Sequence, residues 1–123
     1  MAYAAVVTVT TVGGDTIVEI AESNVAAGDE ATIAGVPSTG RILRQTCVLT
    51  AGTGTTVNPV LAISAGGTGV NIIVSNATPA ATVDNADPTV AWHGGSGTIY
   101  HQSNVDAGAD NVISTRYLIE AGW

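Results

Sequence analysis

Apolar residues at every second position are the feature that most constrains this fold. The alternation runs through residues 16–23 (TIVEIAES), 41–50 (RILRQTCVLT) and 111–120 (NVISTRYLIE). Successive side chains of a β-strand point to opposite faces of the sheet, so a period of two predicts strands with one buried face. In residues 41–50, a strict alternation places Ile42 and Arg44 on one face, opposite Gln45 and Cys47.

Shorter runs of the same kind lie between the long ones, and clusters of Gly, Asp, Asn and Ser separate them. The shorter runs are residues 31–35, 57–64, 69–75, 88–92 and 97–103. Many short strands about ten residues apart indicate an all-β protein. We expect one β-sandwich or jelly-roll domain spanning residues 1–123. Residues 76–88 (NATPAATVDNADP) are expected to form an exposed loop, and no stable helix is predicted.

The first strand of the chain is unusual because it is apolar on both faces. Residues 2–12 read AYAAVVTVTTV. An exposed strand of this kind invites pairing with other chains, so residues 1–12 are expected either to close a sheet of their own subunit or to lie on a neighbour as an arm. At the other end, Trp123 is expected to pack on its own core or across an interface.

The charge balance excludes several classes of function. The chain has ten acidic and three basic residues, a net charge of −7, and no lysine. Phosphate neutralisation requires clustered cations, so neither a nucleic acid nor an anionic membrane is expected as a partner. Only 11% of the residues are charged. This low share predicts that surface is hidden against other subunits, although the many threonines offer an alternative source of solubility.

Targeting and redox features are few. The single cysteine, Cys47, excludes an internal disulfide and lies in an apolar strand, so a buried inert thiol is expected. The start of the chain has no cationic region typical of a signal peptide, and no apolar run approaches the length of a membrane span. We expect synthesis in the cytoplasm.

The stretch AWHGGSGTIYH, residues 91–101, resembles an active site at first sight. Its Ser96 lies in a Gly-x-Ser-x-Gly-like sequence, but Thr98 occupies the last glycine position and no helix is predicted to follow. We therefore expect a glycine-rich hairpin joining residues 89–92 to residues 98–101. His93 and His101 flank it and could approach each other, but two histidines and Asp106 make a weak zinc site. Hydrogen-bonded or exposed histidines are the expected alternative, and the chain is not expected to be an enzyme.

Two acidic clusters, residues 84–87 and 106–111, could in principle hold calcium. Neither matches a twelve-residue EF-hand loop, and the preference of Asp and Asn for turns explains both. The glycine-rich segments lack the lysine and the following helix of a phosphate-binding loop. We expect no cofactor and no metal.

Several features together resemble small structural proteins of tailed bacteriophages, and most closely their head decoration, or cement, proteins. They are the acidic Ala-, Thr-, Gly- and Val-rich composition, the apolar start, residues 29–61 (DEATIAGVPSTGRILRQTCVLTAGTGTTVNPVL) and the closing ISTRYLIEAGW. The resemblance implies a sandwich subunit, often trimeric, on the exterior of the capsid, made in the host cytoplasm. There it would clamp neighbouring major capsid proteins, with a terminal arm as part of the clamp. The interface residues that we predict on this basis are Tyr3, Val6, Val7, Val9 and Trp123.

Two other functions remain open. The chain could be a tail, fibre or adaptor component of the virion, which a ring-forming or axial oligomer would indicate. It could also be a small lectin-like module, for which Trp92 and Tyr100 form the candidate aromatic platform. Cross-strand packing of these two side chains inside the sandwich is the simpler expectation.

Overall fold

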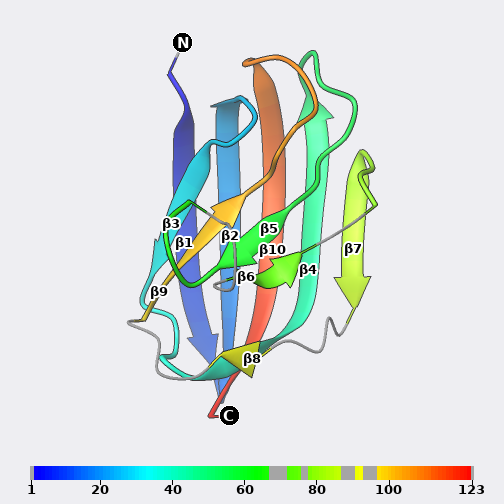
Figure 1. Ribbon diagram of the computed structural model, residues 1–123. Coiled ribbons are helices and arrows are strands. Elements are labelled where there is room, and N and C mark those ends of the chain that lie inside the picture. The colour runs from blue at the N-terminus through cyan, green and yellow to red at the C-terminus, as the bar shows by residue number, and fades with distance from the viewer. Residues whose placement is uncertain (1, 67–71, 76–77, 87–90, 93–96, 123) are drawn as a thin grey trace.

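Two antiparallel β-sheets packed face to face make up the fold (Figure 1). The computed structural model describes residues 2–66, 72–75, 78–86, 91–92 and 97–122. The predicted all-β sandwich is confirmed, and these described ranges contain no helix. Accordingly, no helix in the described part of the chain is long and apolar enough to cross a membrane.

The larger of the two sheets, called the large sheet below, contains the long strands. Within the described residues its strand order is β1-β2-β10-β4-β7, and the short β8 pairs with the beginning of β4. Figure 1 shows β1 and β7 at its two edges. The bounds are β1 (Ala4–Val12), β2 (Asp15–Val25), β4 (Gly40–Ala51), β7 (Thr82–Ala86), β8 (Ala91–Trp92) and β10 (Asn111–Ala121).

The small sheet covers the inner face of the large one. Its strand order is β3-β9-β5-β6, with bounds β3 (Glu30–Ala34), β5 (Val60–Ala62), β6 (Ile72–Ser75) and β9 (Thr98–Gln102). The main core lies between the sheets and consists of small aliphatic side chains around one tyrosine, Tyr117. Its buried members are Val18, Ile20, Ala31, Ile33, Val36, Ile42, Leu61, Val74, Ile99, Tyr117 and Ile119.

The inner faces of the long strands follow the predicted alternation with one correction. In β10, Ile113, Tyr117 and Ile119 are buried as expected. In β4, the strict alternation is wrong, because Ile42 is buried on the same side as Gln45. The β4–β10 register shifts here, since Leu118 lies opposite Arg44 and Ile119 lies opposite Ile42. One extra residue in β4 makes a β-bulge, which restarts the alternation.

The segment predicted as an exposed loop, residues 76–88, contains strand β7 instead. β7 pairs with β4, so Asp84 lies opposite Thr46 and Asn85 lies opposite Gln45. The loop prediction is wrong because Asp and Asn, which favour turns in isolation, here find partners on β4. Asn85 donates from Nδ2 to Oε1 of Gln45 over 2.7 Å.

The predicted hairpin around residues 91–101 is also wrong. β8 pairs with β4 in the large sheet, whereas β9 pairs with β3 and β5 in the small sheet. The two strands therefore belong to different sheets. Trp92 and Tyr100 are consequently not cross-strand neighbours.

Asn111, at the start of β10, fixes two loops at one end of the sandwich. Its amide nitrogen donates to the carbonyl oxygens of Val25 at 2.8 Å and Ala107 at 2.9 Å. Its Oδ1 accepts the backbone N–H of Gly54 at 2.8 Å. A Cβ on Gly54 would lie 2.8 Å from this Oδ1 and 2.4 Å from Cγ2 of Val105, so glycine is required for the close approach.

Replacing this buried amide should destabilise the fold. We expect Asn111→Ala to lower the free energy of unfolding by roughly 2–4 kcal/mol, because one buried and two part-buried backbone groups lose their partner. Chemical denaturation measures the change. Asp110→Ala is the matched control, since Asp110 makes exposed contacts to Thr53 and should cost clearly less. Equal losses in the two variants would contradict the role given to Asn111.

Candidate docking surface and buried polar network

Strand β1 is an edge of the large sheet. It pairs with β2 along its whole length, from Ala4 opposite Ser23 to Val12 opposite Asp15, without a shift in register. Residues 4–12 therefore form an edge strand of their own subunit, which is one of the two predicted alternatives. The other edge of β1 has no neighbouring strand among those that the structure describes.

The four predicted contact residues of this segment point in different directions. Val6 is 68% exposed on the outer face of the large sheet. Val7 and Val9 are half-buried and pack against the main core. Tyr3 is half-buried, and its hydroxyl donates to Glu22 Oε2 at 2.7 Å. The fifth predicted residue, Trp123, lies outside the described residues, and contact of any of the five with another subunit stays a prediction.

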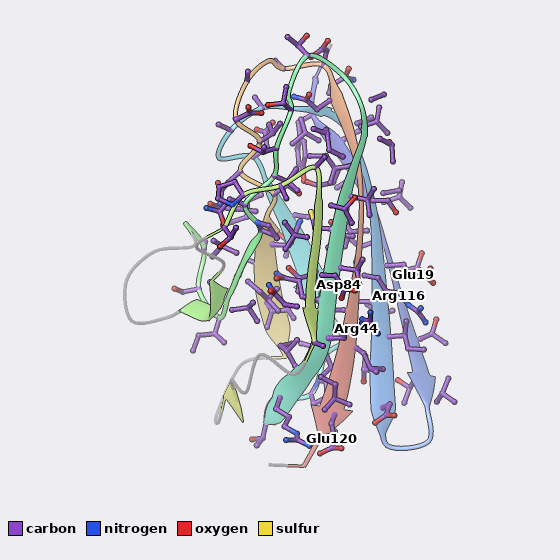
Figure 2. All side chains as sticks on the ribbon, turned by 90° about the vertical axis from the view of Figure 1, so that its right-hand side faces the viewer. Glu19, Arg44, Asp84, Arg116 and Glu120 are labelled. Carbon is purple, nitrogen blue, oxygen red and sulfur yellow. The ribbon has the colours of Figure 1, made fainter. Side chains whose placement is uncertain are left out.

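The outer face of the large sheet, the side away from the small sheet, carries all three arginines of the chain. Arg44 makes a two-point contact with Asp84, including 2.9 Å from Nε to Oδ1. Arg41 Nε lies 3.3 Å from Glu120 Oε1. Arg116 lies opposite Glu19 in the β2–β10 register and opposite Thr46 in the β4–β10 register, farther from Arg41 along the sheet than Arg44 is. Figure 2 shows Glu19, Arg44, Asp84, Arg116 and Glu120 projecting on this same side.

The outer face of the large sheet has a different charge balance from the rest of the chain. Its three arginines stand beside Glu19, Asp84 and Glu120, and Asp15 lies opposite Glu120, so the face has a net charge of about −1 and most of the surplus negative charge lies elsewhere. Two hollows of about 330 and 320 Å³ flank Arg116. Exposed Val6 and Val112 lie on the same face. A nearly neutral face with exposed apolar side chains is the best candidate docking surface of the described molecule.

Beneath that face, a chain of polar side chains crosses the core around Glu22. The Glu22 side chain is fully buried, and Oε1 accepts the hydroxyl of Ser103 at 2.7 Å. Ser103 Oγ lies 2.8 Å from His101 Nε2, and His101 Nδ1 lies 2.6 Å from the Tyr117 hydroxyl. Gln45 Nε2 donates to that hydroxyl at 2.9 Å. All these side chains are buried and hydrogen-bonded, as a polar core requires.

This cluster contains serine, histidine and glutamate but lacks the arrangement of a catalytic triad. In a triad the carboxylate binds the ring nitrogen remote from the serine. Here Glu22 Oε1 lies 3.4 Å from Nε2, the same nitrogen that contacts Ser103. His101 and Ser103 have no exposed surface, so a substrate has no access to them. The arrangement is suited to holding strands together rather than to nucleophilic catalysis.

The two titratable groups of the network stabilise each other's charge. Burial alone raises the pKa of Glu22, but hydrogen bonds from His101, Tyr3 and Ser103 and the charge of His101 bring it below its usual value. Burial lowers the pKa of His101, but its bonds to Cys47 and Glu22 and the Glu22 charge raise it to about 9. Glu22 and His101 therefore form a buried ion pair at neutral pH.

Glu22, Ser103 and Gln45 were not predicted as members of any cluster. One signal was available for Glu22, because it shares the inward positions of β2 with Val18 and Ile20. A carboxylate on a buried face needs partners, so its position alone indicates a polar network. The identity of those partners depends on β4, β9 and β10, which the sequence pattern does not pair.

The candidate metal-binding residues are engaged with the protein itself. Both ring nitrogens of His101 contact side chains in the core. Asp106 accepts the backbone N–H groups of Thr55 and Thr56 at 2.7 and 3.0 Å. The hydroxyl of Thr55 also donates to Asp106, and this bond together with the two backbone bonds lowers the pKa of Asp106 to about 2. In the described ranges, no group of three or more His, Cys, Asp or Glu side chains is placed to hold a metal ion.

The structure describes only some of the other residues that the sequence analysis singled out. Cys47 is fully buried, as predicted. His93 and Ser96 lie outside the described residues, as does the side chain of Trp92. Tyr100 is half-buried in the small sheet.

Comparisons with known proteins give one structural likeness. No protein-family model matches the sequence, and no curated protein matches it. Among solved structures, the fold is similar to a chain of the cyanophage Pam1 capsid asymmetric unit, with a TM-score of 0.42 and 16% sequence identity. The similarity covers 98% of this chain and 82% of that chain. An assignment of function therefore depends on the sequence and surface of this chain itself.

Tyr3 should matter more for stability than its position near the chain terminus indicates. We expect Tyr3→Phe to lower the free energy of unfolding by roughly 1.5–3 kcal/mol, because the buried Glu22 carboxylate loses a hydrogen-bond donor. Denaturant unfolding measures this change. Val6→Ala is the control, because Val6 faces solvent and should change stability by less than about 0.5 kcal/mol. A Tyr3→Phe variant as stable as the native chain would show that Glu22 does not need this donor.

The buried ion pair predicts a pH-dependent stability. His101 has a pKa raised from 6.5 to about 9, so its contribution is complete below pH 6.5 and is lost as the pH rises through about 9. Glu22 has a lowered pKa, so its contribution is present above 4.5 and is lost on acidification. The pair therefore stabilises the fold most between these two limits.

Unfolding free energies measured from about pH 5 to pH 10 test the alkaline side of this window. The native chain should lose stability above pH 6.5, whereas His101→Gln, although less stable throughout, should lose much less over the same interval. The alkaline side is the more specific test, since Asp84, Asp106 and Asp110 also have lowered pKa values and contribute on the acid side. Parallel curves for the two proteins would exclude His101 as the titrating group.

Proposed function

We propose that the chain is a structural protein of a phage virion that binds the outer surface of the capsid and bridges neighbouring major capsid protein subunits. The observation that carries the proposal is the outer face of the large sheet, which is nearly neutral in a chain of net charge −7 and exposes Val6 and Val112. The resemblance of the sequence to decoration proteins indicates the major capsid protein as the partner. The outer face of the large sheet is the surface that we propose for the contact.

The physical basis of such a function is binding, without catalysis. A protein that binds only the assembled capsid stabilises that state by mass action. A symmetric oligomer multiplies weak contacts, and a trimer, which the sequence resemblance favours, would match a local three-fold axis. The large negative charge suits a position outside the capsid, away from packaged DNA. No cofactor is needed, and the serine and histidine of the core network are buried where they support the fold.

The two alternative functions differ from the proposed one in the assembly that the chain would form or in the residues that would make the contact. A tail, fibre or adaptor component would form a ring or an axial oligomer and would not saturate the capsid surface. The lectin-like alternative loses support, because the strands of Trp92 and Tyr100 belong to different sheets. Both alternatives are outcomes of the test below.

Co-sedimentation with expanded phage heads that lack this protein tests the proposal. We expect saturable binding at a symmetric copy number and greater heat resistance of the heads. Val112→Asp should weaken binding at least tenfold, about 1.4 kcal/mol, because it places a charge in the apolar contact.

The control is Thr32→Asp, which adds the same charge on the outer face of the small sheet, where Thr32 is exposed. It should bind like the native chain. No binding by the native chain would overturn the capsid proposal and favour a tail or adhesion component. Equal weakening by both variants would overturn the assignment of the contact to the large sheet.

A further inference from the structure

The edges of the two sheets are protected to different degrees. Natural proteins blunt exposed edges with short strands, charges, prolines or bulges. Among the described strands, the edge strands β3 and β7 have five residues each and carry Glu30 and Asp84, and β6 has four residues. β1 has nine residues, AAVVTVTTV, with no charge, no proline and no bulge against β2. β1 is therefore the edge best prepared to accept another strand.

The sequence of β1 is complementary to itself in the antiparallel direction. A two-fold axis through Thr8 places Val7 opposite Val9 of the second copy and Val6 opposite Thr10 of the second copy. Each pair lies on one face of the joined sheet, because residues at equal distances from the axis share the same face. β-Branched side chains opposite one another stabilise antiparallel pairs, and Thr8 would meet its own counterpart.

Burial and charge favour the same contact. Val7 and Val9 are only partly buried in one copy, and the pairing would cover the side that remains open. Two copies of net charge −7 repel each other, so they associate best where neither carries charge. β1 meets that condition along its whole length.

We propose that β1 pairs antiparallel with β1 of a second copy, with the axis at Thr8, so that the two large sheets become one continuous sheet. This inference goes beyond the proposed function and does not depend on it. The contact is two-fold and uses only the β1 edge, so a three-fold contact through another surface is compatible with it. On a capsid it would link neighbouring oligomers.

Engineered cysteines test the register directly. In the proposed pair the Cα atoms of Thr8 and its counterpart are about 4.5–5.5 Å apart, within the range of a disulfide. The Cα atoms of the two Thr10 residues would be about 14 Å apart, which is too far for a disulfide. Mild oxidation of Thr8→Cys should therefore give a covalent dimer, whereas Thr10→Cys should not. Native Cys47 is fully buried and does not compete.

Sedimentation equilibrium provides the second measurement. The native chain should show a concentration-dependent species of twice the 12.2 kDa chain mass, or an even-numbered multiple of it. Thr8→Asp should remove this association, because two like charges would lie directly opposite each other, whereas Thr32→Asp should retain it.

Three outcomes would overturn the inference: a native chain that is monomeric at every concentration, a purely trimeric chain, or cross-linking of Thr10→Cys as efficient as that of Thr8→Cys. Val112→Asp separates this inference from the proposed function, because its charge lies on β10, away from the β1 edge, and the variant should keep the dimer while it weakens binding to heads. Capsid binding without dimers would leave the proposed function in place.

Discussion

A buried carboxylate organises this sandwich. Glu22 lies fully inside the core, where an ionised group is tolerated only if it is paired and hydrogen-bonded. Its partners come from two segments far apart in the chain, since Tyr3 precedes β1, whereas His101 lies on β9 and Ser103 follows β9. The chain of contacts continues through Tyr117 and Gln45 to Asn85 on β7. The hydrogen bonds thus join one edge of the large sheet to the other and tie both to the small sheet.

How much of this follows from the sequence depends on the range of the interaction. The alternation in β10 predicts its buried face correctly, because each side chain there obeys a local rule. The bulge in β4 was not predictable from the same rule, since it depends on the strand opposite. β7 was missed for a similar reason, because Asp84 and Asn85 favour a turn until β4 supplies Arg44 and Gln45. Local patterns predict the strands, whereas partners on distant strands decide the exceptions.

The candidate site was also predictable from the sequence only where local patterns decide it. The sequence indicated that chemistry around the histidines was weak, and the one histidine in the described residues lies inside the core. The grouping of all three arginines on one face was not anticipated, because Arg41 and Arg44 lie on β4 and Arg116 on β10. Only the pairing of these strands shows that the positive charges meet at one surface. Among the described residues, Cys47, His101 and Ser103 are buried, whereas Val6 and Val112 are exposed.

The hydrogen bond of Tyr3 changes how the beginning of the chain should move. Terminal edge strands are usually the first segments to open and exchange their amide hydrogens with solvent. Here, opening the start of β1 withdraws a donor from a buried carboxylate, so this local motion carries a cost that ordinary fraying does not. The amides at the beginning of β1 are therefore coupled to the cooperative unit of the core. The hydrogen bond of Tyr3 thus restrains β1 in the free chain. A partner that paired with the open edge of β1 would therefore cause little further loss of backbone conformational entropy.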